Sequence, residues 1–225
     1  MAKVFLSAGH GGTDSGAVAN GLKEKDVNLT MMLACREELV RHGVIVVCSR
    51  TSDANDPVGE EVREANSANY DIVFSIHNNA GGGDGFEAYY YDSDAYGKRL
   101  AQLCEKHVKA IGQNSRGIKK GSHLYFVRET KATAVLVEGA FLDNKSDVTI
   151  IDTVAEQRKF GSAYAKAILE YFGIAYKVPA ASSNPSTPIS SGTIYRVQVG
   201  AFSDKKNAEK LAAELKAKGY SAIVK

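Results

Sequence analysis

The stretch Lys3-Val4-Phe5-Leu6-Ser7-Ala8-Gly9-His10-Gly11-Gly12 joins an apolar run directly to a glycine-rich turn that carries a histidine. The arrangement returns at Ile72-Val73-Phe74-Ser75-Ile76-His77, where a second apolar run ends on a second histidine. Short apolar runs without polar alternation are typical of strands that are buried on both faces of a parallel sheet. In such sheets, sites gather at the carboxyl ends of the strands. The two stretches therefore predict an α/β fold with a functional site near His10 and His77.

Strand and helix patterns alternate through the first 174 residues, which favours a largely parallel sheet covered by helices on two sides. Strand-like runs cover residues 3–8, 44–49, 71–77, 85–91, 124–128 and 134–139. Helical stripes cover residues 26–42, 56–69, 96–111 and 155–172.

The composition changes after residue 174. Three of the four prolines and a cluster of serines fall between residues 175 and 193, which is the composition of a linker. Residues 194–225 then show a strand pattern at 195–201, a helical stripe over 208–215 and a strand pattern at 220–224, so we expect a small C-terminal βαβ unit. A unit of this size buries little apolar surface by itself and needs a partner surface.

Bulk composition excludes several classes of protein. Apolar residues make up 44% and charged residues 24% of the chain, as in ordinary soluble globular proteins. Residues 1–174 carry 20 Lys and Arg against 23 Asp and Glu, so we expect no nucleic-acid partner for this part. Three cysteines without CxxC spacing indicate buried thiols and no disulfide framework. The chain has no long apolar stretch and no signal-peptide pattern, so we expect no membrane partner and synthesis in the cytoplasm without a signal peptide.

Four polar residues stand where a structural residue is a poor choice: His10, Glu24, His77 and Glu138. Two imidazoles and one carboxylate near strand and helix ends form a zinc site with one open position. Taken singly, His10 could cap a helix and Glu24 could complement a helix dipole. Glu138 interrupts the apolar run 134–137, where an unpaired carboxylate is unfavourable, and such groups are commonly functional. Glu138 is therefore the candidate base of a metal-assisted hydrolase.

Other catalytic patterns are absent. The sequence contains no G-x-S-x-G elbow, no HExxH and no complete phosphate-binding glycine motif. His42 and His107 fit structural positions on helices. His123, in a Gly-Ser-His loop, stays open between a substrate contact and a structural role, and no substrate-binding residue is assigned.

Four ordered motifs resemble the zinc-dependent N-acetylmuramoyl-L-alanine amidases of the Amidase_3 type. They are residues 7–17, residues 22–29, Ser75-Ile76-His77-Asn78-Asn79-Ala80 and residues 135–144. The resemblance covers residues 1–174 and implies a twisted, mostly parallel six-stranded sheet flanked by helices. It implies that His10, Glu24 and His77 bind Zn²⁺ and that Glu138 is catalytic. The implied reaction is hydrolysis of the amide bond between N-acetylmuramic acid and L-alanine in peptidoglycan.

Residues 194–225 are similar to the first half of a SPOR domain, which binds peptidoglycan glycan strands. Because a whole SPOR fold has a second βαβ half, three alternatives stay open: the tail pairs with a second chain, giving a homodimer; it docks on the body; or it is a truncated piece of a whole SPOR domain. Two rival functions stay open: a zinc peptidase that cuts within the stem peptide, and a wall-binding module without activity. We expect release to the cell wall through a phage holin, as for an endolysin, or through lysis of a sporulating mother cell, as for an autolysin.

Overall fold

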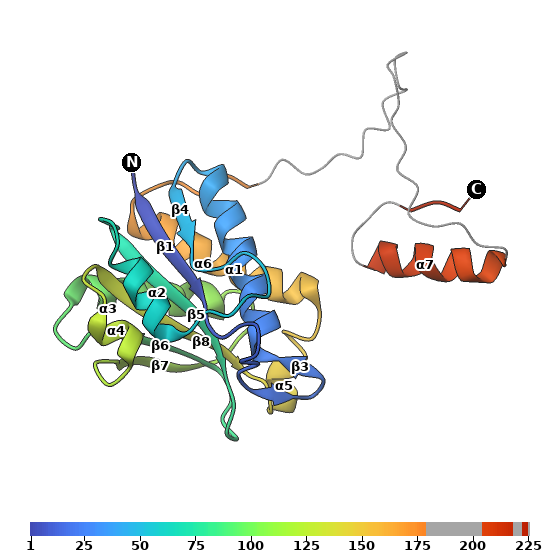
Figure 1. Ribbon diagram of the computed structural model, residues 1–225, viewed down its shortest axis with the longest axis horizontal. Helices are drawn as coiled ribbons and strands as arrows, with labels where there is room; N and C mark the ends of the chain where they lie inside the picture. The colour runs from blue at the N-terminus through green and yellow to red at the C-terminus, as the bar shows by residue number, and fades with distance from the viewer. Residues whose placement is uncertain (179–203, 218–221, 225) are drawn as a thin grey trace, which may run out of the picture. The chain divides into compact units, whose positions relative to one another are not determined.

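The computed structural model describes residues 1–178, 204–217 and 222–224 (Figure 1). The chain divides into two compact units, Met1–Lys177 and Val178–Lys225, which are described separately below.

The first unit is built on one six-stranded sheet. Its strand order is β4 (Ile45–Cys48), β1 (Lys3–Ala8), β5 (Ile72–Asn79), β8 (Thr133–Phe141), β6 (Phe86–Tyr90) and β7 (Ser115–Lys120). Neighbouring strands are parallel except for β6 and β8, which are antiparallel. The predicted α/β class and the mostly parallel six-stranded sheet are confirmed.

The two faces of this sheet carry very different amounts of apolar cover. Helices α1 (Glu24–Arg41), α3 (Ala95–Lys109) and α6 (Val154–Tyr171) contribute to the main core on one face. The other face has a small core under α2 (Val58–Ala65) and α4 (Tyr125–Glu129), made by Phe5, Val62, Ala65, Val73, Phe126 and Ala134. On this second face, the carboxyl ends of the strands are therefore available for polar side chains.

A short antiparallel hairpin separates the first two site motifs. Strands β2 (Val18–Ala19) and β3 (Leu22–Lys23) are joined by Asn20 and Gly21, whose φ angles are 50° and 78°. An Asn-Gly pair with both φ angles positive is the favoured two-residue hairpin turn. The hairpin reverses the chain, so that the start of α1 returns beside the end of β1.

One predicted strand is wrong, and one strand of the six-stranded sheet was missed. Most of residues 124–128 belong to the helix α4 (Tyr125–Glu129), because a short apolar run does not distinguish a strand from a buried helical turn. The sixth strand is instead β7, whose sequence Ser-Arg-Gly-Ile-Lys-Lys has no apolar pattern. An edge strand pairs on one side only and tolerates such charges. The helix predicted over 56–69 is also shorter, because it begins at Val58 and ends at Ala65.

The three cysteines are free. Cys35 and Cys104 are buried, as predicted, whereas Cys48 is only half-buried. The last short helix of the first unit is α5 (Lys145–Val148). Among the residues that the structure describes, no helix combines the length and the apolar character needed to cross a membrane.

The second unit contributes one described helix, α7 (Lys205–Ala217), which confirms the helical stripe expected there. The strand predicted around residues 195–201 lies outside the described residues. Of the strand predicted at 220–224, residues 222–224 are described and belong to no strand.

Candidate metal and catalytic site

His10 lies in the turn that follows β1. Its φ angle of 64° is in the left-handed region, which a non-glycine residue adopts only where the surroundings require it. Its Nδ1 is 2.8 Å from Asp14 Oδ2, and its Nε2 is 3.2 Å from Glu24 Oε2. The bond to Asp14 selects the tautomer and orients the ring, so that Nε2 faces the site. The bond to Glu24, with Asp14 adding to it, raises the pKa of His10 to about 9 despite partial burial.

Glu24 is the first residue of α1 and is 5% exposed. Its Oε2 accepts a hydrogen bond from the backbone N–H of Ala17 at 3.0 Å, and its Oε1 accepts one from the backbone N–H of Asn78 at 3.2 Å. Burial opposes ionisation, but the hydrogen bonds with His10 and His77 outweigh it and hold the pKa of Glu24 well below its usual range. Glu24 is therefore a carboxylate at neutral pH.

His77 comes from the carboxyl end of β5, and its Nδ1 is 3.1 Å from Glu24 Oε1. Burial lowers and Glu24 raises the pKa of His77, with a net increase. The ring lies against the backbone of Gly9: a Cβ at position 9 would be 1.9 Å from the His77 Cε1 atom. Glycine at this position is thus required by the place of the His77 ring.

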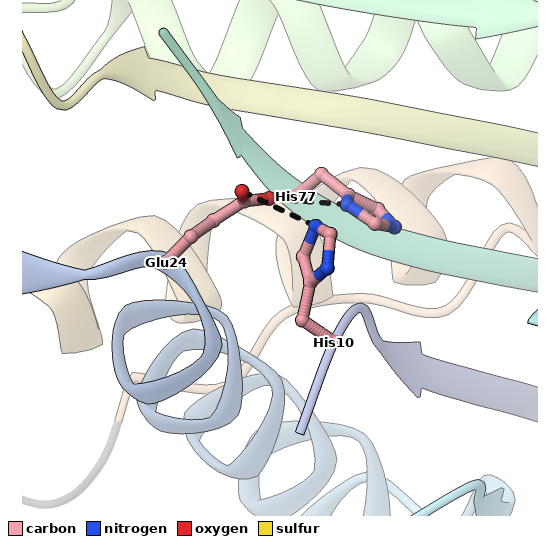
Figure 2. Close-up of side chains that lie close together, drawn as sticks. All are labelled: His10, Glu24 and His77. Carbon is pink, nitrogen blue, oxygen red and sulfur yellow. Dashed lines mark hydrogen bonds and ion pairs between the residues drawn. The ribbon is translucent and has the colours of Figure 1, made fainter. Parts of the chain in front are cut away.

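The three side chains together fit one metal ion. Each offers one ligand atom, and these atoms lie within 4.8 Å of one another. Figure 2 shows Glu24 reaching from the start of α1 toward both imidazole rings, whose centroids are 5.2 Å apart. A tetrahedral zinc ion with bonds of about 2.0–2.1 Å separates its ligand atoms by about 3.3–3.5 Å. Glu24 Oε2 lies 3.2 Å from His10 Nε2, and the other oxygen, Oε1, lies 3.1 Å from His77 Nδ1; both distances are close to that separation.

Glu138 lies on β8 directly opposite His77 in the parallel ladder. Its Oε2 is shielded from solvent and has no hydrogen-bond partner among the described residues. Burial raises the pKa of Glu138 to about 7, against a partial opposing effect of His77. A carboxyl group with a pKa near neutrality both accepts and returns a proton easily. The structure thus brings together all four residues that the sequence singles out.

A layer of asparagines behind Glu24 was missed by sequence reasoning. Asn28 Nδ2 donates to Gly9 O at 3.0 Å and to Glu24 Oε1 at 3.2 Å. Asn78 Nδ2 in turn donates to Asn28 Oδ1 at 2.8 Å. Both asparagines are buried, and they fix the Glu24 carboxylate. The available signal was the spacing of Asn28 from Glu24, since residues four apart share one helix face.

Arg50 ties the same region together from the loop after β4. Its Nε donates to Ala8 O at 2.9 Å, and its terminal nitrogen donates to Lys25 O at 2.8 Å. The end of β1 and the first turn of α1, which carry His10 and Glu24, are therefore cross-linked by one guanidinium group. No sequence pattern marked Arg50, because its partners are backbone carbonyls.

A second carboxyl group of raised pKa, Glu61, was also missed. It lies on the buried face of α2, is 2% exposed, and burial raises its pKa to about 7. His77 acts on it electrostatically and partly opposes this increase. The signal was the pair Val62 and Ala65 on the same short helix, which are buried and mark the inward face on which Glu61 lies.

The remaining histidines lie elsewhere. His42 stacks on Tyr176 and accepts a hydrogen bond from the Lys177 backbone, and His107 Nε2 is 2.7 Å from Glu170 Oε2, so both are structural. His123 is exposed, and its ring lies edge-on to Tyr89 with the centroids 5.9 Å apart.

Two protein families match this chain. Residues 4–170 match Amidase_3, described as N-acetylmuramoyl-L-alanine amidase, and residues 165–225 match the SPOR domain.

Characterised relatives agree with the family match. A sporulation-specific N-acetylmuramoyl-L-alanine amidase of Bacillus subtilis is 34% identical over 100% of this chain and 84% of its own length. An endolysin of Bacillus phage SPP1 is 35% identical over 84% of this chain and 73% of its own length.

Solved structures support the same assignment. The catalytic domain of CwlV, an N-acetylmuramoyl-L-alanine amidase from Paenibacillus polymyxa var. colistinus, is 31% identical with a TM-score of 0.72, over 78% of this chain and 100% of that domain. The chain therefore belongs to the Amidase_3 family and hydrolyses the amide bond between N-acetylmuramic acid and L-alanine in peptidoglycan.

Proposed function

We propose that this hydrolysis depends on a zinc ion held by His10, Glu24 and His77, and that Glu138 carries the protons. The observation that supports the proposal is the convergence of three ligand atoms within 4.8 Å, beside a carboxyl group that faces His77 across the sheet. When bound, zinc supplies Lewis-acid chemistry: it lowers the pKa of water and polarises a carbonyl group.

The residues around the three ligands hold them in place. Asp14 keeps the Nε2 of His10 directed at the site, and Asn28 and the backbone N–H of Asn78 fix Glu24. Partners of this kind raise metal affinity because they reduce the motion that binding would otherwise have to stop. Two neutral imidazoles and one carboxylate form the donor set of a hydrolytic zinc site.

Glu138 accepts the proton of the attacking water and returns it to the alanine nitrogen as the amide bond breaks. Its pKa of about 7 suits both steps near neutral pH. Within the described part of the chain, its Oε2 accepts none of the hydrogen bonds that hold Glu24 as an anion. The two glutamates therefore take different roles in one site.

The C-terminal unit serves to hold the enzyme on its substrate. It matches the SPOR domain, and peptidoglycan is both substrate and binding partner of the chain. The tail, residues 194–225, follows a linker of residues 175–193 and pairs with the tail of a second chain to form a homodimer. Light scattering of the full chain tests this pairing: a dimer mass is expected, and a monomer mass contradicts it.

The chain reaches the wall after lysis of the cell or through a holin. The relatives that support this include one described as sporulation-specific and one described as an endolysin. Because both settings place an amidase at the wall when the cell opens, they share one chemistry and differ in the trigger.

Wall digestion with end-group analysis tests the reaction and its mechanism together. Purified peptidoglycan is treated with wild type and with Glu138→Ala, and the zinc content of both proteins is measured. Free N-terminal alanine is expected from wild type, whereas new termini within the stem peptide would identify a peptidase. The variant should bind zinc and release nothing. A fully active metal-free wild type, or an undiminished variant, would overturn the proposal.

A further inference from the structure

Strand β7, which the sequence pattern missed, places two cations on the same face of the sheet as Glu138. Glu87 on β6 lies directly opposite Glu138 in the antiparallel ladder and is 2% exposed. Arg116 Nε and Lys119 Nζ, both from β7, each lie 2.5 Å from Glu87 Oε1. Tyr89 donates its hydroxyl hydrogen to Glu87 Oε2 at 2.6 Å. One buried carboxylate thus holds two cations beside the proposed proton carrier.

A β-bulge in β7 is what brings these two cations together. Residues three apart on a regular strand point to opposite faces. In β7, however, Ser115 pairs with Phe86 and Ile118 pairs with Ala88, so three steps on β7 match two steps on β6. Gly117 supplies the extra residue, with a φ angle of 90°. Bulges beside active sites commonly re-aim a side chain, and here the result is that Arg116 and Lys119 share one face.

Two cations are more than the Glu87 carboxylate needs to balance its charge. Glu87 already accepts the Tyr89 hydroxyl, and a single cation would balance its charge. With two, the cluster of Glu87, Arg116 and Lys119 carries a net positive charge. The Arg116 and Lys119 side chains are 43% and 36% exposed, so both are reachable by a ligand. Asp84 also attracts Arg116 electrostatically. Lys119 is therefore the cation that is more available to a ligand.

The order of strands sets which part of the substrate meets this cluster. The strands lie in the order β1, β5, β8, β6 and β7 (Figure 1). His10 follows β1, His77 is on β5 and Glu138 is on β8, and both cations lie beyond it on β7. The leaving nitrogen receives its proton from Glu138, so the peptide side of the substrate extends toward β6 and β7. Opposed residues of an antiparallel pair have Cβ atoms about 4.5–5.5 Å apart. Because one extended residue spans about 3.3–3.6 Å, the cluster is within one or two residues of the cleaved bond.

We infer that Arg116 and Lys119, held on Glu87 by the bulge at Gly117, bind a carboxylate group of the stem peptide within two residues of the cleaved bond. The inference rests on the proposed role of Glu138, which fixes the direction of the peptide. A charge-assisted hydrogen bond to a carboxylate is the interaction that these donors make best. The cluster would make the enzyme selective for peptides that carry a free acid at that place over those with an amide.

Two soluble N-acetylmuramoyl-L-alanyl peptides that differ in one group test this subsite: the second residue carries either a free carboxylate or a carboxamide. Wild type should favour the carboxylate by about tenfold or more in kcat/KM, mainly through KM, as expected for one charged hydrogen bond. Lys119→Met should bring the ratio of the two values close to one. Lys119→Arg should keep the preference, because it keeps the charge.

Lys120→Met is the matched control. Lys120 is on the same strand but pairs in register with Tyr90, whose side chain belongs to the core of the opposite face, and it is exposed. This variant should keep the wild-type ratio. Equal kcat/KM for the two peptides in wild type, or an equal loss on both in Lys119→Met, would overturn the subsite. Failure of wild type to release free N-terminal alanine from either peptide would instead contradict the proposed function.

Discussion

The site has two sides, and each contains a glutamate in a different environment. On the α1 side, made by His10, Glu24, Asn28 and Asn78, the carboxylate of Glu24 accepts hydrogen bonds from backbone and side chains. On the β8 side, Glu138 has an oxygen without any partner among the described residues. The pKa of Glu24 is depressed, whereas burial raises the pKa of Glu138 to about 7. Burial alone therefore does not decide the charge of a carboxyl group; its partners do.

The largest effect should come from removing Glu138, the proposed proton carrier on the β8 side. Glu138→Gln keeps the size of the side chain and removes its ability to take a proton. Loss of a general acid–base group reduces kcat by about 10²–10⁴-fold. The measurement is kcat on a soluble muramoyl-peptide, with zinc content and thermal unfolding as controls for metal and fold. A variant that loses its zinc as well as its activity would contradict the separation of the two sides.

The next effect should come from the α1 side and should appear in metal binding. Glu24→Gln removes the charge that the two imidazoles share, so zinc should be lost on dialysis against a weak chelator while wild type retains it. Glu37→Gln is the matched control, because Glu37 lies on the same helix, exposed and paired with Arg158. Zinc per chain, measured by atomic absorption, gives the result. Equal retention by Glu24→Gln and wild type would remove Glu24 from the ligand set.

A third comparison concerns the glycine on which the His77 ring packs. Gly9→Ala would place a Cβ 1.9 Å from His77 Cε1, so the ring must move. Overpacking of this kind destabilises by about 1–3 kcal/mol, and zinc affinity should fall with it. Gly59→Ala, on α2 in open space, should instead stabilise by about 0.5–1 kcal/mol. Urea unfolding of both variants measures the difference, and similar changes in both would show that the approach at Gly9 has no consequence.

The smallest effect is a pH dependence that distinguishes the two sides in the metal-free protein. The pKa of Glu138 is raised from 4.5 to about 7 on folding, so its contribution to stability is present at low pH and is lost as pH rises through 7. Glu24, with a depressed pKa, contributes the reverse: its stabilisation is lost as pH falls. When the pH is raised from about 5 to 8, the free energy of unfolding of Glu138→Gln should therefore increase by about 2 kcal/mol relative to that of wild type. Urea unfolding at both pH values measures this gain, and a constant difference would contradict the raised pKa.

Much of the site was predictable because its chemistry is local. His10 and His77 each follow an apolar run, and Glu138 interrupts one, so a polar residue in an unusual place marked them. Asn28 and Arg50 were missed because ordinary polar residues on a helix or in a loop carry no such mark. Their role depends on which carbonyls and carboxylates the fold brings near them.

The sequence by itself determined the α/β class, the alternation of strands and helices in the first unit, and the four residues proposed for the site. These follow from apolar periodicity and from the penalty for placing a polar group in an apolar run. Only the tertiary structure decided that Tyr125–Glu129 are helical, that β7 is the sixth strand, and that a bulge turns Arg116 and Lys119 to one face. The reason is that an edge strand is defined by the neighbour with which it pairs, and pairing leaves no periodic signal in a charged sequence.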